Sequence, residues 1–370
     1  MAHDVDADDA APPLSIARQG YLFAGGTVRE APGRPMAGQL YAEFQIPHPR
    51  TQPFPIVMVH GGGQTGTNFT GTPDGREGWA QFFLRRGYAV YVVDQVGRGR
   101  AAYWPEVYGA PSPARYDAVV QRFTAPARFK LWPQAHLHTQ FPGTGPDVGM
   151  PGDAVFEQFY ASQVPAIASF AEQQRLNCAA LVALLDKIGP AILLTHSQSA
   201  TFQWPVADAR PALVKAIVSV EPNGPPVHDV EFHGAPDYFS DAEPRKVSGL
   251  GHVPLTYSPP VTEASPLEFV RQERPDAEGL VPCWRQKEPA RKLPNLQGIP
   301  LLILTGEASY HAPYDHCTSQ YLEQAGVRHT FIRLADRGIR GNGHMMMIEK
   351  NNREIAAVIA DWLATALTGG

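Results

Sequence analysis

The stretch Ala191-Ile-Leu-Leu-Thr-His-Ser-Gln-Ser199 decides how the rest of the chain is interpreted. An apolar run, 191–194, leads to a serine flanked by small residues, and a helix-compatible segment, 200–209, follows directly. A buried strand that meets a helix through a tight turn lifts the serine hydroxyl clear of the sheet, and the usual signature of that turn is Gly-x-Ser-x-Gly. Thr195 and Ser199 stand at the two glycine positions here. The stretch predicts a nucleophilic Ser197, and an ordinary strand-to-helix turn is the alternative.

A glycine-rich loop follows an earlier apolar strand in Phe54-Pro-Ile-Val-Met-Val-His-Gly-Gly-Gly-Gln-Thr-Gly66. Backbone with almost no side chains can approach a ligand closely. Loops of this kind supply an N–H group to the oxyanion of acyl-transfer reactions. By position, the donors here are the N–H groups of Gly62 and of Gln198, the residue after the serine. A phosphate-binding loop would need Lys-Ser or Lys-Thr after the glycines, and neither is present. We expect His60 to have a structural role.

The general base is predicted from the C-terminal part of the chain. The segment His329-Thr-Phe-Ile-Arg-Leu-Ala335 has the pattern of a strand, and a glycine-rich loop ending in Gly-Asn-Gly-His344 follows it. Among thirteen histidines, His344 alone lies in such a loop between the last predicted strand and the terminal helix, 351–367. A histidine placed there can reach a serine at the carboxyl edge of the sheet.

The acid that would orient this histidine has two candidates. Glu221 ends the predicted strand 216–221, where the catalytic groups of parallel sheets gather. Glu307 follows the next predicted strand, 299–305, and could instead be engaged by Ser309 and Tyr310 beside it. Asp315 and Asp336 are expected to be helix caps or loop charges. The residues alone leave the choice between Glu221 and Glu307 open.

Four motifs together resemble the bacterial esterases of the Alcaligenes type, a branch of the α/β-hydrolase superfamily. They are His60-Gly-Gly-Gly-Gln-Thr-Gly66, Thr195-His-Ser-Gln-Ser199, Val220-Glu-Pro-Asn223 and Gly341-Asn-Gly-His344. The resemblance spans about residues 40–367 and implies an α/β-hydrolase fold, with a mostly parallel eight-stranded sheet flanked by helices.

The same resemblance implies a catalytic triad of Ser197, His344 and Glu221, with Gly62 and Gln198 as oxyanion donors. Some relatives carry adjacent, mutually bonded cysteines where Gly62 and Gly63 stand. This chain lacks that disulfide, and therefore lacks the rigidity it would give to the oxyanion loop.

Composition favours one large domain over residues 1–370, because 44% of the residues are hydrophobic and no linker divides them. A net charge of −5 without a basic run argues against nucleic acid and anionic membrane surfaces as partners. No apolar stretch approaches the roughly 20 residues that span a bilayer. Cys178, Cys283 and Cys317 allow at most one internal disulfide and lack the Cys/His spacing of a zinc site.

The first residues, Met1-Ala-His-Asp-Val-Asp-Ala-Asp-Asp9, have neither the basic nor the apolar region of a signal peptide. As written, the chain would be cytoplasmic. Removal of a leader before residue 1 would make it periplasmic or secreted.

Two long insertions interrupt the core, at about residues 101–165 and 224–297. Long loops in a compact domain are usually functional. Both begin at the carboxyl edge of the predicted sheet, so we expect them to form a cap over Ser197, made firm by their prolines. Trp104, Trp132 and Trp284 lie in these insertions and are candidates for contacting substrate, with core packing as the alternative. The segment Met345-Met-Met-Ile348 is expected to pack in the core.

These observations predict a serine esterase that hydrolyses carboxylic esters through an acyl-enzyme, without a metal or organic cofactor. A small-molecule ester is the expected partner, and a homodimer is left open. A lactonase or amidase with the same triad is the alternative within hydrolases. A non-catalytic binding protein on the same fold is the alternative from another class. Acyl and alcohol preference and enantioselectivity are outside what the residues predict.

Overall fold

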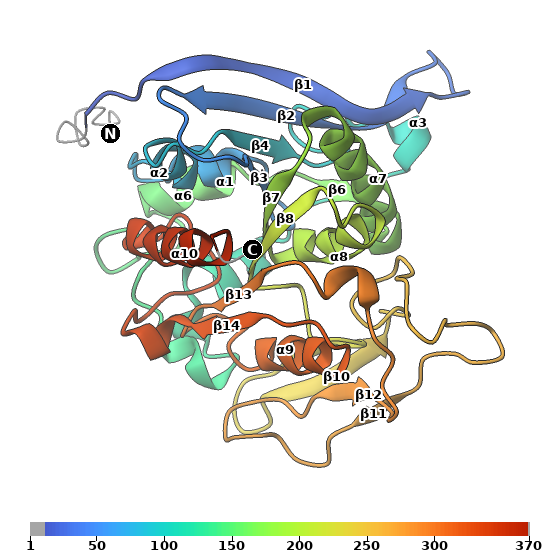
Figure 1. The fold of residues 1–370 in the computed structure, drawn as a ribbon. Helices are drawn as coiled ribbons and strands as arrows, with labels where there is room; N and C mark the ends of the chain where they lie inside the picture. The colour runs from blue at the N-terminus through green and yellow to red at the C-terminus, as the bar shows by residue number, and fades with distance from the viewer. Residues whose placement is uncertain (1–11, 369–370) are drawn as a thin grey trace.

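The computed structural model describes residues 12–368 (Figure 1). The acidic stretch 1–9, on which the expectation about a signal peptide was based, lies outside the described residues. Within them, the fold is organised around an eight-stranded sheet in the order β1-β2-β4-β3-β7-β8-β13-β14.

The strands of this sheet differ in length and direction. β1, β2 and β4 pair antiparallel, and every pair from β4 to β14 is parallel, which confirms the predicted mostly parallel sheet. Their bounds are β1 Ile16–Val28, β2 Met36–Pro47, β3 Ile56–Val59, β4 Val90–Asp94, β7 Ala191–His196, β8 Val214–Val220, β13 Leu301–Thr305 and β14 Thr330–Arg333.

Helices cover both faces of the sheet, because alternate side chains of its central strands point to opposite sides. Ile56 and Met58 of β3 join the core under one set of helices, and Val57 and Val59 join the core under the other. The first set is α2 Trp79–Leu84 and α10 Asn352–Ala366, and the second is α7 Phe170–Ile188, α8 Ala200–Ala209 and α9 Asp315–Gln324. Figure 1 shows α10 and α7 on opposite sides of the strands. The Met345–Ile348 segment is buried in the first core, as predicted.

The two insertions contain only short elements. The first carries α3 Pro105–Tyr108, β5 Pro111–Ser112, α4 Tyr116–Val119, the π-helical turn η1 Val120–Thr124, α5 Pro126–Phe129, η2 Pro133–Leu137 and α6 Ala154–Ala161, and β6 Ala166–Ile167 follows it. The second carries the two hairpins β9 His228–Phe232 with β10 Phe239–Pro244, and β11 Phe269–Arg271 with β12 Trp284–Gln286, before η4 Pro294–Leu296. The remaining short elements are α1 Thr67–Thr70, η3 Ser197–Ser199 and η5 Leu334–Arg337.

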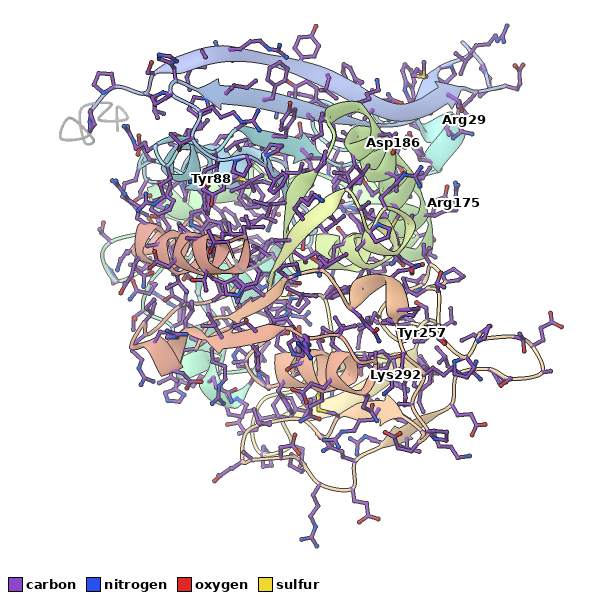
Figure 2. All side chains as sticks on the ribbon, viewed as in Figure 1. Arg29, Tyr88, Arg175, Asp186, Tyr257 and Lys292 are labelled. Carbon is purple, nitrogen blue, oxygen red and sulfur yellow. A yellow bond between two sulfur atoms is a disulfide. The ribbon has the colours of Figure 1, made fainter. Side chains whose placement is uncertain are left out.

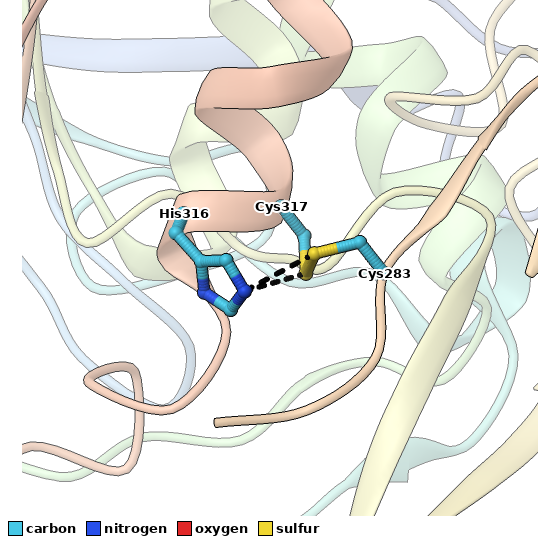
Figure 3. Close-up of side chains that lie close together, drawn as sticks. All are labelled: Cys283, His316 and Cys317. Carbon is cyan, nitrogen blue, oxygen red and sulfur yellow. Dashed lines mark hydrogen bonds between the residues drawn. A yellow bond between two sulfur atoms is a disulfide. The ribbon is translucent and has the colours of Figure 1, made fainter. Parts of the chain in front are cut away.

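The second insertion is fastened to α9. Cys283 forms a disulfide with Cys317, and the ring of His316 lies against it, with Nε2 3.2 Å from Cys283 Sγ (Figure 3). Because the two sulfur atoms are bonded to each other, this Cys-His-Cys group offers no thiolate to a metal. Tyr257, labelled in Figure 2, adds a hydroxyl contact of 2.8 Å with Tyr321.

Cys178 remains a buried free thiol, so the chain forms the single disulfide that its three cysteines permit. No helix in residues 12–368 combines the length and apolar character needed to cross a membrane.

Candidate active site

Ser197 stands on a strained turn between β7 and α8. Its φ is +54°, in the left-handed region that side chains rarely adopt and that is a recurrent feature of functional turns. Ser199 occupies the second glycine position without conflict, since its hydroxyl donates to the carbonyl of Val59, 2.7 Å away, and accepts from His196 N–H. Thr195, at the first glycine position, donates to Gln203 Oε1 at 2.5 Å. The hydroxyl groups of the two residues that depart from the usual signature therefore both form internal hydrogen bonds.

Glu221 and His344 form a buried pair beside this turn. Glu221 Oε2 lies 2.5 Å from His344 Nδ1, and neither side chain is more than 1% exposed. With the carboxylate as acceptor, Nδ1 carries the proton and Nε2 keeps its lone pair, as a general base requires. Glu221 Oε1 also accepts from Gly306 N–H at 2.8 Å, and Oε2 accepts from the Ser309 hydroxyl at 2.6 Å. Three donors thus fix the orientation of the carboxylate.

Glu307, the alternative acid, points elsewhere. Its carboxylate pairs with Arg340, 2.6 Å away, and accepts from Gly341 N–H at 2.9 Å. The expectation that Ser309 would bond to Glu307 was wrong, because the loop after β13 turns Ser309 toward the neighbouring strand end, where Glu221 lies.

Asp315 is also not the cap or loop charge that we expected. It is fully buried, accepts from Thr305 at 2.6 Å and lies 2.9 Å from His311 Nδ1. Asp336 pairs with Arg333 at the exposed end of β14, in agreement with its prediction as a loop charge.

The loop after β13 supplies two site residues that sequence reasoning missed. Tyr310 lines the same cavity as Ser197, and its hydroxyl lies 3.3 Å from His344 Nε2. The His311 ring stacks on the His344 ring at 4.7 Å. In the described part of the chain, Ser197 makes no direct hydrogen bond to His344, a bond that often tightens only when substrate is bound. The signal in the sequence was the position of this loop after a strand of the sheet, at the carboxyl edge where catalytic groups gather.

Burial sets the protonation of the histidines. The pKa of His344 is held well below 6.5, first by burial and then by the neighbouring His196, His311 and Arg122. Burial likewise lowers the pKa of His196 to about 3 and that of His311 to about 4, so these rings are neutral near pH 7. For Glu221, burial raises the pKa above its usual value, while the hydrogen bonds from Ser309 and Gly306 act in the opposite direction and favour the carboxylate.

His196, Glu221 and His344 bring ligand atoms within 4.8 Å of one another. The facing atoms of Glu221 and His344 already bond to each other, and His196 Nε2 lies 3.0 Å from the His344 carbonyl oxygen. The donor set is therefore arranged for proton transfer rather than for holding an ion.

The glycine loop lies directly against the serine. A Cβ on Gly61 would come within 3.0 Å of Ser197 Cβ, so only glycine fits there without a shift. Gly62 faces the Gln198 side chain, with 3.7 Å from its ideal Cβ to Gln198 Oε1. Gln198 lies in the first turn of the helical segment that starts at Ser197, where N–H groups have no partner within the helix. Gly62 and Gln198, the two residues predicted to supply the oxyanion donors, therefore adjoin each other.

Arg98 braces this loop through its hydrogen bonds. Its guanidinium is buried and donates to the Gly61 carbonyl at 2.8 Å and to Gln198 Oε1 at 2.8 Å. A third bond, to Gln173 at 2.6 Å, anchors it on α7. Burial lowers the pKa of Arg98 to about 9, so it remains a cation at neutral pH. His60 beneath the loop accepts from Gln95 N–H and is structural, as expected.

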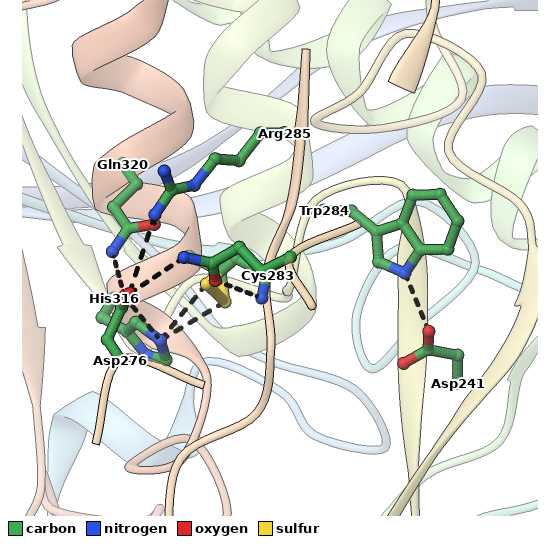
Figure 4. Close-up of a disulfide and its surroundings, with 9 residues drawn as sticks. Asp241, Asp276, Cys283, Trp284, Arg285, His316 and Gln320 are labelled. Atoms are coloured by element: carbon green, nitrogen blue, oxygen red, sulfur yellow. Dashed lines mark hydrogen bonds and ion pairs between the residues drawn. A yellow bond between two sulfur atoms is a disulfide. The ribbon is translucent and has the colours of Figure 1, made fainter. Parts of the chain in front are cut away.

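One cavity includes Ser197 and residues of the first insertion, and a second includes the neighbouring Gln198 and residues of both insertions. None of the three candidate tryptophans lines either cavity. Trp104 is on the surface, and Trp284 donates to Asp241 at 2.8 Å in the second insertion (Figure 4). Trp132 is buried behind Tyr310, at a ring distance of 6.1 Å, and donates to the Ala308 carbonyl. Trp132 and Trp284 therefore pack within the protein, which is the alternative that the sequence left open, whereas the Trp104 side chain is partly exposed.

Comparison with known proteins agrees with this architecture. No protein-family model matches the chain. A bacterial esterase solved at atomic resolution aligns with 96% of this chain and 98% of its own, at a TM-score of 0.63 and 25% identity. The probable secreted lipase phiG of Fungal sp. (strain ATCC 74256) is 45% identical over 326 residues, which are 88% of this chain and 85% of the relative.

The chain therefore belongs to the α/β-hydrolase superfamily, among its carboxylic ester hydrolases. Within that class, one relative, at 45% identity, is the fungal protein described as a probable secreted lipase.

Proposed function

We propose that Ser197, His344 and Glu221 are the catalytic triad of this ester hydrolase. His344 Nε2 takes the hydroxyl proton as Ser197 Oγ attacks the ester carbonyl carbon. The N–H groups of Gly62 and Gln198 stabilise the oxyanion, and Glu221 stabilises the imidazolium. The alkoxide leaves with the proton from His344, and water, activated by the same ring, hydrolyses the acyl-enzyme.

The observation that carries the proposal is the convergence of three donors on Glu221, which presents the carboxylate to His344 Nδ1 at 2.5 Å. A buried carboxylate held this firmly fixes the histidine tautomer that general-base catalysis needs. The strained φ of Ser197 and the adjoining glycine loop support the same assignment.

We also propose that the two insertions act as a cap. Ser112, Val119 and Phe123 of the first insertion line a cavity that also includes Ser197. Val230 and Phe232 of the second insertion line the cavity on the other side. Substrate would enter between them.

Secretion is the localisation that we propose. The probable secreted lipase supports it, and so does the disulfide Cys283–Cys317, since disulfides persist mainly in oxidising compartments.

Labelling with a fluorophosphonate tests the nucleophile. The wild-type protein should be labelled and should hydrolyse aryl esters, whereas Ser197→Ala should lose both, with turnover reduced on the order of a millionfold. Ser112→Ala is the matched control, because Ser112 lines the same cavity but lies outside the strained turn, and its labelling should persist. Labelling of Ser197→Ala would refute the assignment.

A panel of esters, lactones and amides would then separate the esterase from a lactonase or amidase. Absence of both labelling and turnover in the wild type would favour the binding-protein alternative.

A further inference from the structure

The two cavities beside Ser197 differ in chemistry. Both include Gln198, Asn223 and Tyr310, so they adjoin the same reaction centre. One, of about 310 Å³, has mainly apolar walls from the first insertion and the segment before α7, with Arg98 and Arg115 as its charged side chains. The other, of about 200 Å³, is lined by charged side chains, which are Arg122, Asp229, Arg245 and Lys246.

Arg122 is one of three Arg or Lys side chains that line this second cavity. Its guanidinium lies 5.5 Å from the ring centroids of both Phe232 and Tyr310. Within residues 12–368 it forms no ion pair and no side-chain hydrogen bond, although it is half-buried. A partly desolvated guanidinium retains donors suited to a carboxylate, and an incoming anion would find them preorganised.

Arg122 faces the site because of local backbone geometry. It sits in the π-helical turn η1, and π turns are frequent at functional sites. The next residue, Phe123, stacks on His344 at 5.1 Å, so this turn presents both a charge and a ring to the catalytic centre.

The other charges leave the cavity cationic. Lys246 is neutralised by Asp229, 2.5 Å away. Arg245 is exposed and, among the described residues, has no carboxylate partner. The pKa of His252 is lowered, first by burial and then by Lys246, so this ring is neutral near pH 7. Two arginines thus remain uncompensated, in a protein whose net charge is −5.

We propose that this cationic cavity, built around Arg122, binds a carboxylate group of the substrate. The substrate class is then an ester with a free carboxylate on one side of the ester bond, such as a half-ester of a short dicarboxylic acid. The other side of the ester occupies the apolar cavity. The substrate is short because Tyr310 lines the cavity that includes Ser197, and its ring centroid also lies 5.5 Å from the Arg122 guanidinium. This inference rests on the proposed function, since it names the substrate of the same serine.

Matched esters that differ only in charge test the proposal. The first probes are methyl esters of succinic, glutaric and adipic acid, each with the second carboxyl free or converted to a carboxamide. The second are acetate esters of 3-hydroxypropionate and 4-hydroxybutyrate, with their amides. In the wild type, kcat/KM should favour the carboxylate in at least one series by about 10- to 100-fold, the range that a charge-assisted hydrogen bond supplies.

Arg122→Met should lower this carboxylate-to-carboxamide ratio by about tenfold or more, since it removes the charge and keeps much of the side-chain length. Arg245→Met should lower the ratio less, because Arg245 is exposed. Arg128→Met is the control, since Arg128 is an exposed cation six positions after Arg122 that lines neither cavity. It should leave the ratio unchanged.

A second measurement needs no variant. Free glutarate should inhibit wild-type hydrolysis of a neutral ester competitively, and more strongly than glutaramide, with the advantage falling as salt is raised. A ratio near one in both series, together with equal inhibition by glutarate and glutaramide, would overturn the inference even if Arg122→Met failed to fold. In that case, continued hydrolysis of the neutral esters would leave the proposed function standing. Loss of all ester hydrolysis would instead contradict the proposed function itself.

Discussion

Replacement of Glu221 by glutamine tests the assignment of the acid most directly, because it changes one oxygen to an NH₂ group and keeps the shape. Glu221 accepts three hydrogen bonds, from His344, Ser309 and Gly306. An amide has one acceptor oxygen. If that oxygen keeps the bond to Gly306 N–H, the NH₂ group faces His344 Nδ1, which must then become an acceptor.

The consequence is a change of tautomer. His344 would carry its proton on Nε2, where the lone pair for the Ser197 proton is needed, and no carboxylate would stabilise the imidazolium. The corresponding change in another serine hydrolase triad lowers kcat by about 10⁴-fold, or about 5 kcal/mol of transition-state stabilisation. We expect Glu221→Gln to lose a similar amount.

The assay is kcat for a p-nitrophenyl ester of a short acid, with thermal unfolding measured alongside to check the fold. Glu307→Gln is the control, since Glu307 pairs with Arg340 at the surface, and we expect it to change kcat by less than about threefold. Activity of Glu221→Gln within tenfold of the wild type, or a larger loss in Glu307→Gln, would refute the reasoning.

Two other predictions concern the oxyanion loop and the protonation of the base. Arg98→Met should lower kcat by about 10- to 100-fold with a smaller change in KM, because it frees the Gly61 carbonyl and the Gln198 side chain. Arg100→Met is the control for Arg98→Met, because it alters a half-exposed ion pair with Asp94. Equal losses of kcat in both variants would argue against a specific role of Arg98 in holding the oxyanion loop. Because His344 acts as a base and its pKa is held well below 6.5, kcat/KM should remain high as pH falls and should decline only when the ring gains a proton, below pH 6.5. Arg122→Met removes a nearby positive charge and should therefore move that decline to higher pH, whereas an unchanged profile would show that Arg122 does not act on the base.

The sequence by itself determined the fold, because its signals are local. Fully apolar runs such as Ala191–Leu194 mark strands that are buried on both faces, and such strands require helices on both sides. The serine, the acid and the histidine each come after one of the strands of the sheet, in that order along the chain. The pattern around Ser197, His344 and the glycine loop could therefore be identified before any tertiary contact was known.

Only the tertiary structure decided which groups meet at the site. Glu221 and Glu307 both follow strands of the same sheet. Which of the two carboxylates lies against His344 depends on how the loop after β13 folds. That loop directs the Ser309 hydroxyl to Glu221 and the Tyr310 hydroxyl to His344, through contacts between residues 88 and 34 positions apart. The brace by Arg98 and the cationic cavity around Arg122 also join segments that are distant in sequence. Hydrogen bonds and charge pairing of this kind depend on side-chain positions to within about 0.5 Å, and the periodicity of a sequence carries no such information.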